Sequence, residues 1–542
     1  MRKDKRITEV RRTPTDTVHL LNQAETCLQA KRYREALEHL NQAYKTGLIP
    51  PSSPETYWYH YLRGLTLFWQ GNQTAAWEET EEAFRVFARV HPSFTLPKPE
   101  ELPDFVVKNL SRLRGLELAL LEGLEGQNAD GSGKKRETLE RRIAEISASL
   151  ENLTPLAKLH QLAGSILRPL GKLPEALEHL EWAATGFRLS RNWVSLAETL
   201  NIISLARMAM GELPTAIQIL EQARSYCLQT KDRYFELILQ SNVALCQLMG
   251  GNWKLPLATL PELLTEAKNS NDFPRYSNTL LLWGWANLLG GRLKETRRAF
   301  ADAQRIAAEK KLVGVLKVSY GFCSDLAIAE GRLEEAEKNV KTLLEISREL
   351  TPRGEHVAQA WQVLGEIYAA RKEYDRALKT FAVCLEQLSK QPEKWVEGAV
   401  YRGMGICHAK TEQLRLAQKE FKKAFEIFEA CGNEWEQAKT AVLAGETGAF
   451  AAIEMHPKLV WAKEIFKKLE HPSWRKRAQA LLEHFELVAS NIPLRVAHRL
   501  AEKEQIVKAL AETDGNISQA AKKLGLLRQS LQYKIKQYKI DA

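Results

Sequence analysis

The last fifty residues carry amide, aromatic and cationic side chains whose chemistry suits a nucleic acid. A glutamine amide both accepts and donates hydrogen bonds, so it matches the edge of an adenine, whereas lysine and arginine match phosphate oxygens. We expect Gln529, Gln532 and Tyr533 near bases, and Arg528 and the lysines at phosphates. The candidate contact residues are Asn516, Ser518, Lys522, Lys523, Arg528, Gln529, Ser530, Gln532, Tyr533, Lys534 and Lys536.

Three helices must hold these side chains in place. The first is predicted over residues 494–512 and ends at Asp514 and Gly515, after which the Asn516 side chain caps the second helix. Gly525 permits the tight turn into the third helix. One face of the second helix is apolar and contains Ile517, Ala520, Ala521 and Leu524.

The third helix separates into two faces when each residue advances by 100°. The inner face is expected to pack on the first two helices, and the outer face would meet a major groove. The inner residues are Leu527, Leu531, Ile535 and Tyr538, and the outer residues are Gln529, Tyr533 and Lys536.

Residues 504–536, from Glu504 to Lys536, resemble the Fis-type helix-turn-helix that ends many NtrC-like activators. The resemblance implies that double-stranded DNA is the partner and that the domain works as a homodimer. An apolar stripe on residues 494–512 would serve either that dimer or the internal core, and it contains Val496, Leu500, Ile506, Val507 and Leu510. An ordinary basic surface helix, or a domain that contacts a protein, is the alternative.

Charge is concentrated in the same segment. The chain of 542 residues has a formal net charge of +10. Residues 494–542 contain ten Lys and Arg against five Asp and Glu, which is half of the excess. A cationic segment of this kind favours a polyanionic partner.

A repeat of helix, turn and helix fills most of the remaining chain. Its second helices carry a small or compact residue at a step of nearly 40 residues, and its first helices carry another one twelve residues earlier. The second-helix positions are Ala36, Ala76, Ala176, Ala216, Pro256, Thr296, Ala336, Ala377, Ala417 and Ala462. The first-helix positions are Ala24, Gly64, Gly164, Ser204, Ala244, Gly284, Ser324, Gly365 and Gly405.

The clearest copy runs from Trp361 through Leu364, Gly365 and Tyr368 to Ala377 and Phe381, and it resembles the tetratricopeptide repeat. That repeat commonly has about 34 residues, so the longer step adds close to one turn to each helix. Long arrays of this kind resemble the sensor domains of MalT-like and Rap-type regulators, although kinesin-light-chain-like scaffolds use long units too. By this resemblance a groove binds a peptide or protein, and its candidate residues are Gln161, Asn201, Ser241, Gln362 and Arg402. The alternative is that these residues form an ordinary solvated inner surface.

The predicted architecture is all-α, a tetratricopeptide-like superhelical solenoid of about ten helical hairpins followed by a small helix-turn-helix domain. The array is interrupted at residues 93–154, which we interpret as an irregular helical hairpin or, as an alternative, a linker. The expected parts are a basic tail at 1–15, hairpins at 16–92, the interruption at 93–154, the main array with a capping helix at 155–490, and the helix-turn-helix domain at 491–542.

Several classes of function have no signature in this sequence. There is no G-x-x-x-x-G-K-[ST] phosphate loop, although NtrC-like activators carry an ATPase, and neither H-E-x-x-H nor G-x-S-x-G occurs. We therefore expect no enzyme, no cofactor and no metal. The seven cysteines are scattered at positions that suit a core. No run of about 18 apolar residues and no signal peptide is present, which predicts a cytoplasmic protein without a membrane contact.

The leading hypothesis is a bacterial transcription regulator in which a peptide, protein or small molecule in the groove controls DNA binding. Without an ATPase, it would act by occupying DNA, by recruiting RNA polymerase or by blocking it. The alternative is a scaffold whose repeats recruit a protein, with the C-terminal domain only tethering it to DNA.

Overall fold

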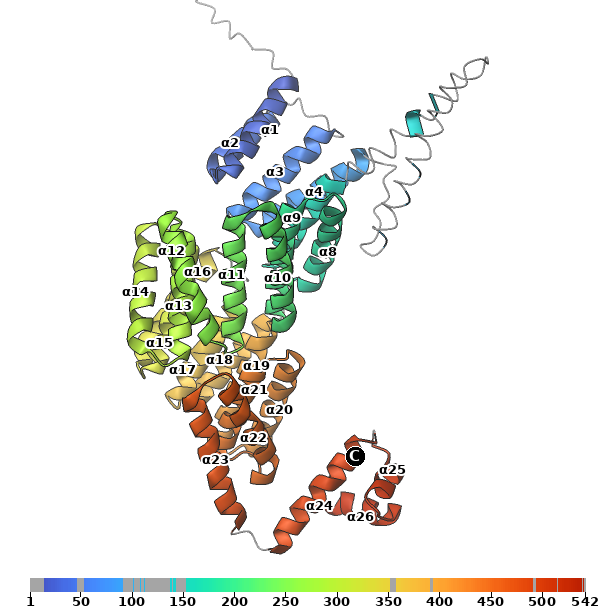
Figure 1. Cartoon of the computed structure of the whole chain (residues 1–542), viewed down its shortest axis with the longest axis vertical. Helices are drawn as coiled ribbons and strands as arrows, with labels where there is room; N and C mark the ends of the chain where they lie inside the picture. Colours follow the sequence, from blue (N-terminus) through green and yellow to red (C-terminus); the bar gives the residue numbers. More distant parts are fainter. Residues whose placement is uncertain are drawn as a thin grey trace, which may run out of the picture. The chain divides into compact units, whose positions relative to one another are not determined.

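The computed structural model describes residues 14–45, 53–90, 153–350, 357–389, 393–490, 494–513, 515–538 and 540, with scattered positions between 101 and 142. Every regular element in these ranges is an α-helix, as predicted (Figure 1). The interruption expected at 93–154 lies almost wholly outside the described residues. None of the helices described is both long and apolar enough to span a bilayer.

The helices follow one another as hairpins. Contacts join the two helices of a hairpin, such as α7 with α8, and also join neighbouring hairpins, such as α8 with α9. The first hairpins are α1 (Pro14–Gln29) with α2 (Tyr33–Lys45) and α3 (Pro54–Trp69) with α4 (Gln73–Val90). The next are α7 (Leu153–Leu167) with α8 (Leu173–Leu189), α9 (Trp193–Ala209) with α10 (Leu213–Thr230), and α11 (Arg233–Met249) with α12 (Lys254–Asn269).

The array continues with the same alternation. These hairpins are α13 (Phe273–Leu289) with α14 (Leu293–Glu309), α15 (Val313–Ala329) with α16 (Leu333–Leu350), and α17 (Val357–Ala370) with α18 (Tyr374–Leu388). The last are α19 (Lys394–Lys410) with α20 (Leu414–Ala430) and α21 (Glu434–Thr447) with α22 (Ala452–Lys468), followed by the capping helix α23 (Pro472–Ser490).

The small residues of the forty-residue repeat are buried, and its glycines lie against the second helix of the same hairpin. All ten second-helix positions and all nine first-helix positions are buried. A Cβ on Gly365 would lie 2.4 Å from Cε1 of Phe381, and one on Gly164 would lie 2.4 Å from Cγ of Leu180. Because no side chain fits there, the two helices of a hairpin can approach closely and bury their apolar faces.

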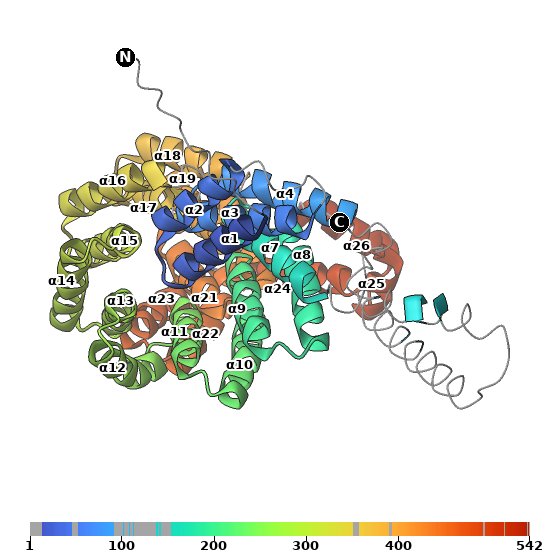
Figure 2. The ribbon, with the colours of Figure 1, turned by 90° about the horizontal axis from the view of Figure 1, so that it is seen from above.

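Two compact units are distinguished by their internal contacts. One comprises residues 1–400 with 427–433, and the other comprises residues 401–426 with 434–542. In the first unit α9 to α16 follow one another along a curve (Figure 2). The same unit places Cys431 Sγ 3.7 Å from the carbonyl oxygen of Met210, although 221 residues separate them. Asn433 Nδ2 likewise donates to the carbonyl oxygen of Met249 at 3.4 Å.

The seven cysteines are free thiols, and six of them are buried, with Cys323 partly exposed. Burial raises the pKa of the Cys246 thiol to about 12 and that of Cys323 to about 11. Thiols with such pKa values are poor nucleophiles at neutral pH. The cysteines are small core residues, as expected.

Candidate functional site

Three short helices form the C-terminal domain: α24 (Leu494–Ala511), α25 (Ile517–Lys523) and α26 (Arg528–Tyr538). They pack around one apolar core. Its buried members are Ile506, Ala509, Leu510, Ala520, Ala521, Leu531 and Ile535. The paired alanines on α25 are 0 % and 2 % exposed, and α26 packs against α25.

The turns between these helices have the predicted chemistry. Asn516 Oδ1 accepts from the backbone N–H groups of Ser518 at 3.1 Å and Gln519 at 3.2 Å, which caps α25. Gly515 and Gly525 have φ values of +77° and +66°, in the region that favours glycine. The expectation that Asn516 acts as a cap and Gly525 as a turn residue is confirmed.

Helix α26 presents a polar outer face. Gln529, Gln532, Tyr533 and Lys536 are exposed, and their spacing of three, four and seven residues aligns them along one side of the helix. The Tyr533 side chain is 68 % exposed although it is aromatic. Leu531 and Ile535, on the opposite side, are buried in the domain core. This face therefore offers two amides, a phenol and an ammonium to a partner.

Leu527 does not pack as predicted. It is 77 % exposed, whereas the sequence placed it on the inner face of the third helix. The neighbouring Leu526 packs against the core instead. Since α26 begins only at Arg528, Leu527 lies outside the helical register on which the prediction depended.

The remaining candidate contact residues lie around this face. Asn516, Ser518, Lys522, Lys523 and Arg528 are exposed, and Ser530 is partly exposed. Lys523 Nζ pairs with Glu512 at 2.7 Å, so part of its charge is balanced within the domain.

Glu502 on α24 is a residue that no sequence pattern singled out. Its carboxylate pairs with Lys534 Nζ at 2.5 Å and accepts a hydrogen bond from the Tyr538 hydroxyl. The hydrogen bond to Glu502 raises the pKa of both Lys534 and Tyr538. Lys534 is therefore engaged by α24, while Lys536 extends from the outer face. Glu502 and Lys534 are 32 residues apart in the sequence, so no local pattern indicates that they are in contact.

The predicted dimer stripe is divided. Ile506 and Leu510 are 1 % and 5 % exposed and belong to the core of the domain, while Val507 is 45 % exposed. The side chains of Val496 and Leu500 lie outside the described residues. The stripe was expected to form either a dimer interface or the internal core, and Ile506 and Leu510 belong to the internal core.

The candidate groove residues on α7, α9 and α11 make side-chain hydrogen bonds inside the array. Gln161 Nε2 on α7 donates to Thr199 Oγ1 on α9 at 3.0 Å. Asn201 Oδ1 on α9 accepts from Asn242 Nδ2 on α11 at 2.7 Å. Ser241 Oγ donates to the Leu237 carbonyl oxygen at 3.0 Å, within α11.

The other two groove residues are nearly buried. Gln362 is 5 % exposed and Arg402 is 6 % exposed. Arg402 Nη1 pairs with Glu436 Oε2 at 2.5 Å. Burial alone would raise the pKa of Glu436, but the charges of Lys439 and Arg402 lower it to about 2. This position therefore binds its neighbouring first helix, α21, rather than facing an open groove.

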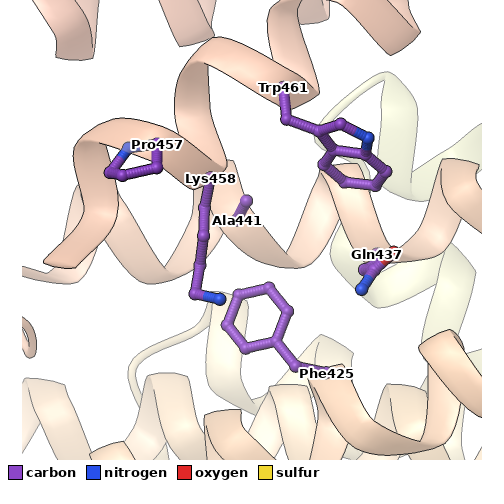
Figure 3. Close-up of a pocket in the computed structure, with 6 residues that line it drawn as sticks. All are labelled: Phe425, Gln437, Ala441, Pro457, Lys458 and Trp461. Carbon is purple, nitrogen blue, oxygen red and sulfur yellow. The ribbon is translucent and has the colours of Figure 1, made fainter. Parts of the chain in front are cut away.

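A pocket of about 260 Å³ lies between α20, α21 and α22 (Figure 3). Its walls combine two aromatic rings, those of Phe425 and Trp461, with the Gln437 amide and the Lys458 ammonium. Lys458 Nζ lies 4.9 Å from the centre of the Phe425 ring. None of the five candidate groove residues lines it.

Metal ligands do not gather in the described part of the chain, where no group of three or more His, Cys, Asp or Glu has a suitable arrangement.

Comparison with protein families gives two matches. Residues 498–538 match the family described as bacterial regulatory protein, Fis family, and residues 360–394 match the tetratricopeptide repeat. They fall on the two segments whose sequences carry these resemblances, which confirms both. Among curated proteins, no relative matches the chain.

Solved structures similar to this chain include a Rap protein in complex with competence and sporulation factor, at 10% identity over 87% of this chain and 98% of that one, with a TM-score of 0.40. A signal transduction ATPase with a tetratricopeptide repeat sensor, from Pyrococcus horikoshii, is 10% identical over 82% of this chain and 70% of its own, with a TM-score of 0.41. Yeast Tom70 is 15% identical over 90% and 99%, with a TM-score of 0.33.

Proposed function

We propose that this chain, a tetratricopeptide-repeat protein that ends in a Fis-type helix-turn-helix, is a cytoplasmic transcription regulator whose array controls its binding to DNA. The observation that carries the proposal is the outer face of α26, where Gln529, Gln532, Tyr533 and Lys536 are exposed together. These side chains are available because the opposite face supplies the core.

The amides and the cations on and around this face have different roles in DNA recognition. The amides of Gln529 and Gln532 hydrogen-bond base edges, with adenine as the best match. Lys522, Lys536 and Arg528 contact phosphates, which gives affinity without sequence information. Lys534 contributes less, because Glu502 already balances its charge. No catalytic step is part of this function.

The test is a salt titration of duplex binding by the full chain. Affinity for a random-sequence duplex is measured by fluorescence anisotropy between 50 and about 300 mM salt. Lys536→Ala is expected to reduce the slope of log affinity against log salt by about one, the value for one phosphate contact. The matched control is Lys467→Ala, which removes an exposed lysine from α22 in the array. No binding at low salt would refute the proposal.

Two copies of the chain are proposed to bind one operator, as the resemblance to Fis-type domains implies. An operator of two half-sites about 10 base pairs apart, centre to centre, would then bind two chains cooperatively. Sedimentation of the chain with one-half-site and two-half-site duplexes, chosen from a selected pool, measures this. A single chain on both duplexes would contradict the dimer.

The array is proposed to bind a peptide, and the pocket of Figure 3 is the surface we assign to it. The rings of Phe425 and Trp461 suit an apolar side chain, and the exposed Lys458 ammonium suits a carboxylate. The ligand chemistry is therefore a segment with an apolar residue next to an acidic one. In the leading form of the proposal, this ligand changes DNA affinity, by occupation of DNA or by contact with RNA polymerase.

Selection from a displayed peptide library with the full chain tests the pocket. Trp461→Ala and Lys458→Gln should abolish enrichment of acidic-apolar sequences, whereas Trp69→Ala, which removes an exposed indole from α3, should not. Equal enrichment in all variants would exclude this pocket.

The same peptides separate a sensor from a scaffold. A sensor changes its affinity for the selected duplex when an enriched peptide is added, because the two equilibria are coupled. A scaffold binds the peptide and the duplex independently. Unchanged duplex affinity at saturating peptide would favour the scaffold.

A further inference from the structure

Leu527 is exposed to a degree that packing does not explain. At 77 % it has the highest exposure of the large apolar side chains that are exposed in the described residues. Leu526 and Leu531 on either side of it contribute to the core of the domain, so the core does not require a third leucine here. An isobutyl group left in water does not gain the favourable free energy that burial would give it.

The same residue occupies the N-cap position of α26. The backbone N–H of Leu531 donates to the carbonyl oxygen of Leu527 at 3.0 Å, which is the first hydrogen bond of the helix, while the helix itself begins at Arg528. A leucine side chain cannot accept from the exposed N–H groups of the first turn. Asn516 makes two such bonds at the corresponding position of α25.

Leu527 is thus unfavourable for folding on two independent grounds, exposure and capping. Its place in the domain suggests what it contributes instead. It directly precedes Arg528 and Gln529, at the N-terminal end of α26, and this end of a recognition helix reaches furthest toward base edges. An apolar side chain there matches the one apolar group in the major groove, the C5-methyl of thymine.

We propose that Leu527 is a specificity residue whose isobutyl group contacts the C5-methyl group of a thymine. The proposal rests on the DNA-binding function stated above. It assigns a task to each residue at the start of α26: Leu527 selects a thymine, Arg528 holds a phosphate, and Gln529 pairs with an adenine edge.

The experiment uses the full chain and duplexes enriched by it from a random pool. Each thymine of an enriched site is replaced in turn by deoxyuridine, which removes only the methyl group. The wild-type chain is expected to lose about four-fold in affinity at one position, the value for one buried methyl group. Leu527→Ser should bind the thymine and uracil duplexes equally, and Leu527→Met should retain a preference for thymine.

Amide hydrogen exchange tests whether Leu527→Ser loses its preference for thymine only because the domain is less well packed. Serine is a favourable N-cap residue, so amide hydrogen exchange in the first turn of α26 should become slower in Leu527→Ser. Weaker thymine discrimination in a domain with slower exchange then supports a contact with DNA. Faster exchange would show that Leu527 is needed for packing and would overturn the proposal.

Other outcomes are equally distinct. Equal affinity of the wild-type chain for thymine and uracil at every position overturns the role of Leu527 but leaves DNA binding intact. A preference for thymine over uracil that persists in Leu527→Ser also overturns the role of Leu527 and leaves DNA binding intact. The exposed leucine would then be assigned to a contact with a protein partner. Absence of duplex binding by the wild-type chain at low salt overturns both proposals.

Discussion

The ammonium group of Lys534 on α26 lies 2.5 Å from the carboxylate of Glu502 on α24. The same carboxylate accepts a hydrogen bond from the Tyr538 hydroxyl at the end of α26. One acidic side chain therefore ties the proposed recognition helix to the first helix of the domain and removes a cation from the surface available to DNA.

We predict that Glu502→Gln strengthens non-specific DNA binding. The amide still accepts from Tyr538 but no longer balances the charge of Lys534, so this lysine can contact a phosphate. The slope of log affinity against log salt should become steeper by about 0.9, the value for one additional phosphate contact. Anisotropy titrations on a random duplex measure this.

A matched control for Glu502→Gln is Glu464→Gln, which removes one negative charge from α22 and leaves the C-terminal domain unchanged. It should alter the slope little, because counterion release counts phosphates contacted rather than net charge. An equal change in both variants would mean that overall charge, and not the release of Lys534, is responsible.

Amide and cationic residues of α26 should have separable effects. Gln529→Ala is expected to weaken binding to a selected duplex by about 1–3 kcal/mol, while binding to a random duplex changes little. Lys536→Ala should weaken both by the same factor. The readout is the ratio of the two affinities for each variant. If Gln529→Ala leaves this ratio unchanged, Gln529 does not face a base.

Close helix crossings make the array sensitive to single methyl groups. A Cβ on Gly365 would lie 2.4 Å from Cε1 of Phe381, whose side chain is fully buried and cannot move aside. We predict that Gly365→Ala destabilises the array by about 1–2 kcal/mol, because overpacking outweighs the gain in helix propensity. The midpoint of urea unfolding, followed by circular dichroism, measures the effect.

Gly321→Ala is the control for Gly365→Ala, since both glycines lie inside first helices. At Gly321 the nearest neighbour of an added Cβ is Leu343 Cδ2 at 3.7 Å, an ordinary contact. This variant should be neutral or more stable by about 0.5–1 kcal/mol. A similar loss in both variants would mean that the methyl group acts through the helix backbone rather than through the crossing.

The buried His160 and the partly buried His179 should make the stability of the array depend on pH. The Nδ1 atoms of His160 and His179 lie 2.9 Å apart, and the His160 ring stacks on Trp182 at a centroid distance of 4.4 Å. Burial lowers the pKa of both rings, and for His160 the neighbouring His179 lowers it further. Glu178 and Glu175 oppose the shift at His179.

Protons bind more readily to the unfolded chain than to the folded array in this pH range. The unfolded chain takes up protons near pH 6.5 while the folded array does not, so stability is complete above pH 6.5 and falls as the pH drops below it. We expect the urea midpoint to decrease between pH 7.5 and 5.5. His160→Phe keeps an aromatic ring against Trp182 and should make this decrease smaller. An unchanged pH dependence in this variant would contradict the assignment.

Local features of the sequence were sufficient to predict much of the fold. The forty-residue step identified the small residues that are buried between helices. Each hairpin repeats the same helix contacts, and close contact between helices requires a small side chain at the same place in every copy. Asn516 as a cap and Gly525 as a turn residue could be predicted for the same reason. These effects depend on a few consecutive residues and on backbone geometry alone.

The sequence by itself determined the all-α repeat, the helices of the C-terminal domain and the polar face of α26. Only the tertiary structure decided the partners of individual side chains. Examples are Glu502 with Lys534, Gln161 with Thr199, and Arg402 with Glu436. Each pair joins different helices 32 to 38 residues apart. Such contacts depend on how the helices cross, and periodicity along one helix cannot specify that geometry.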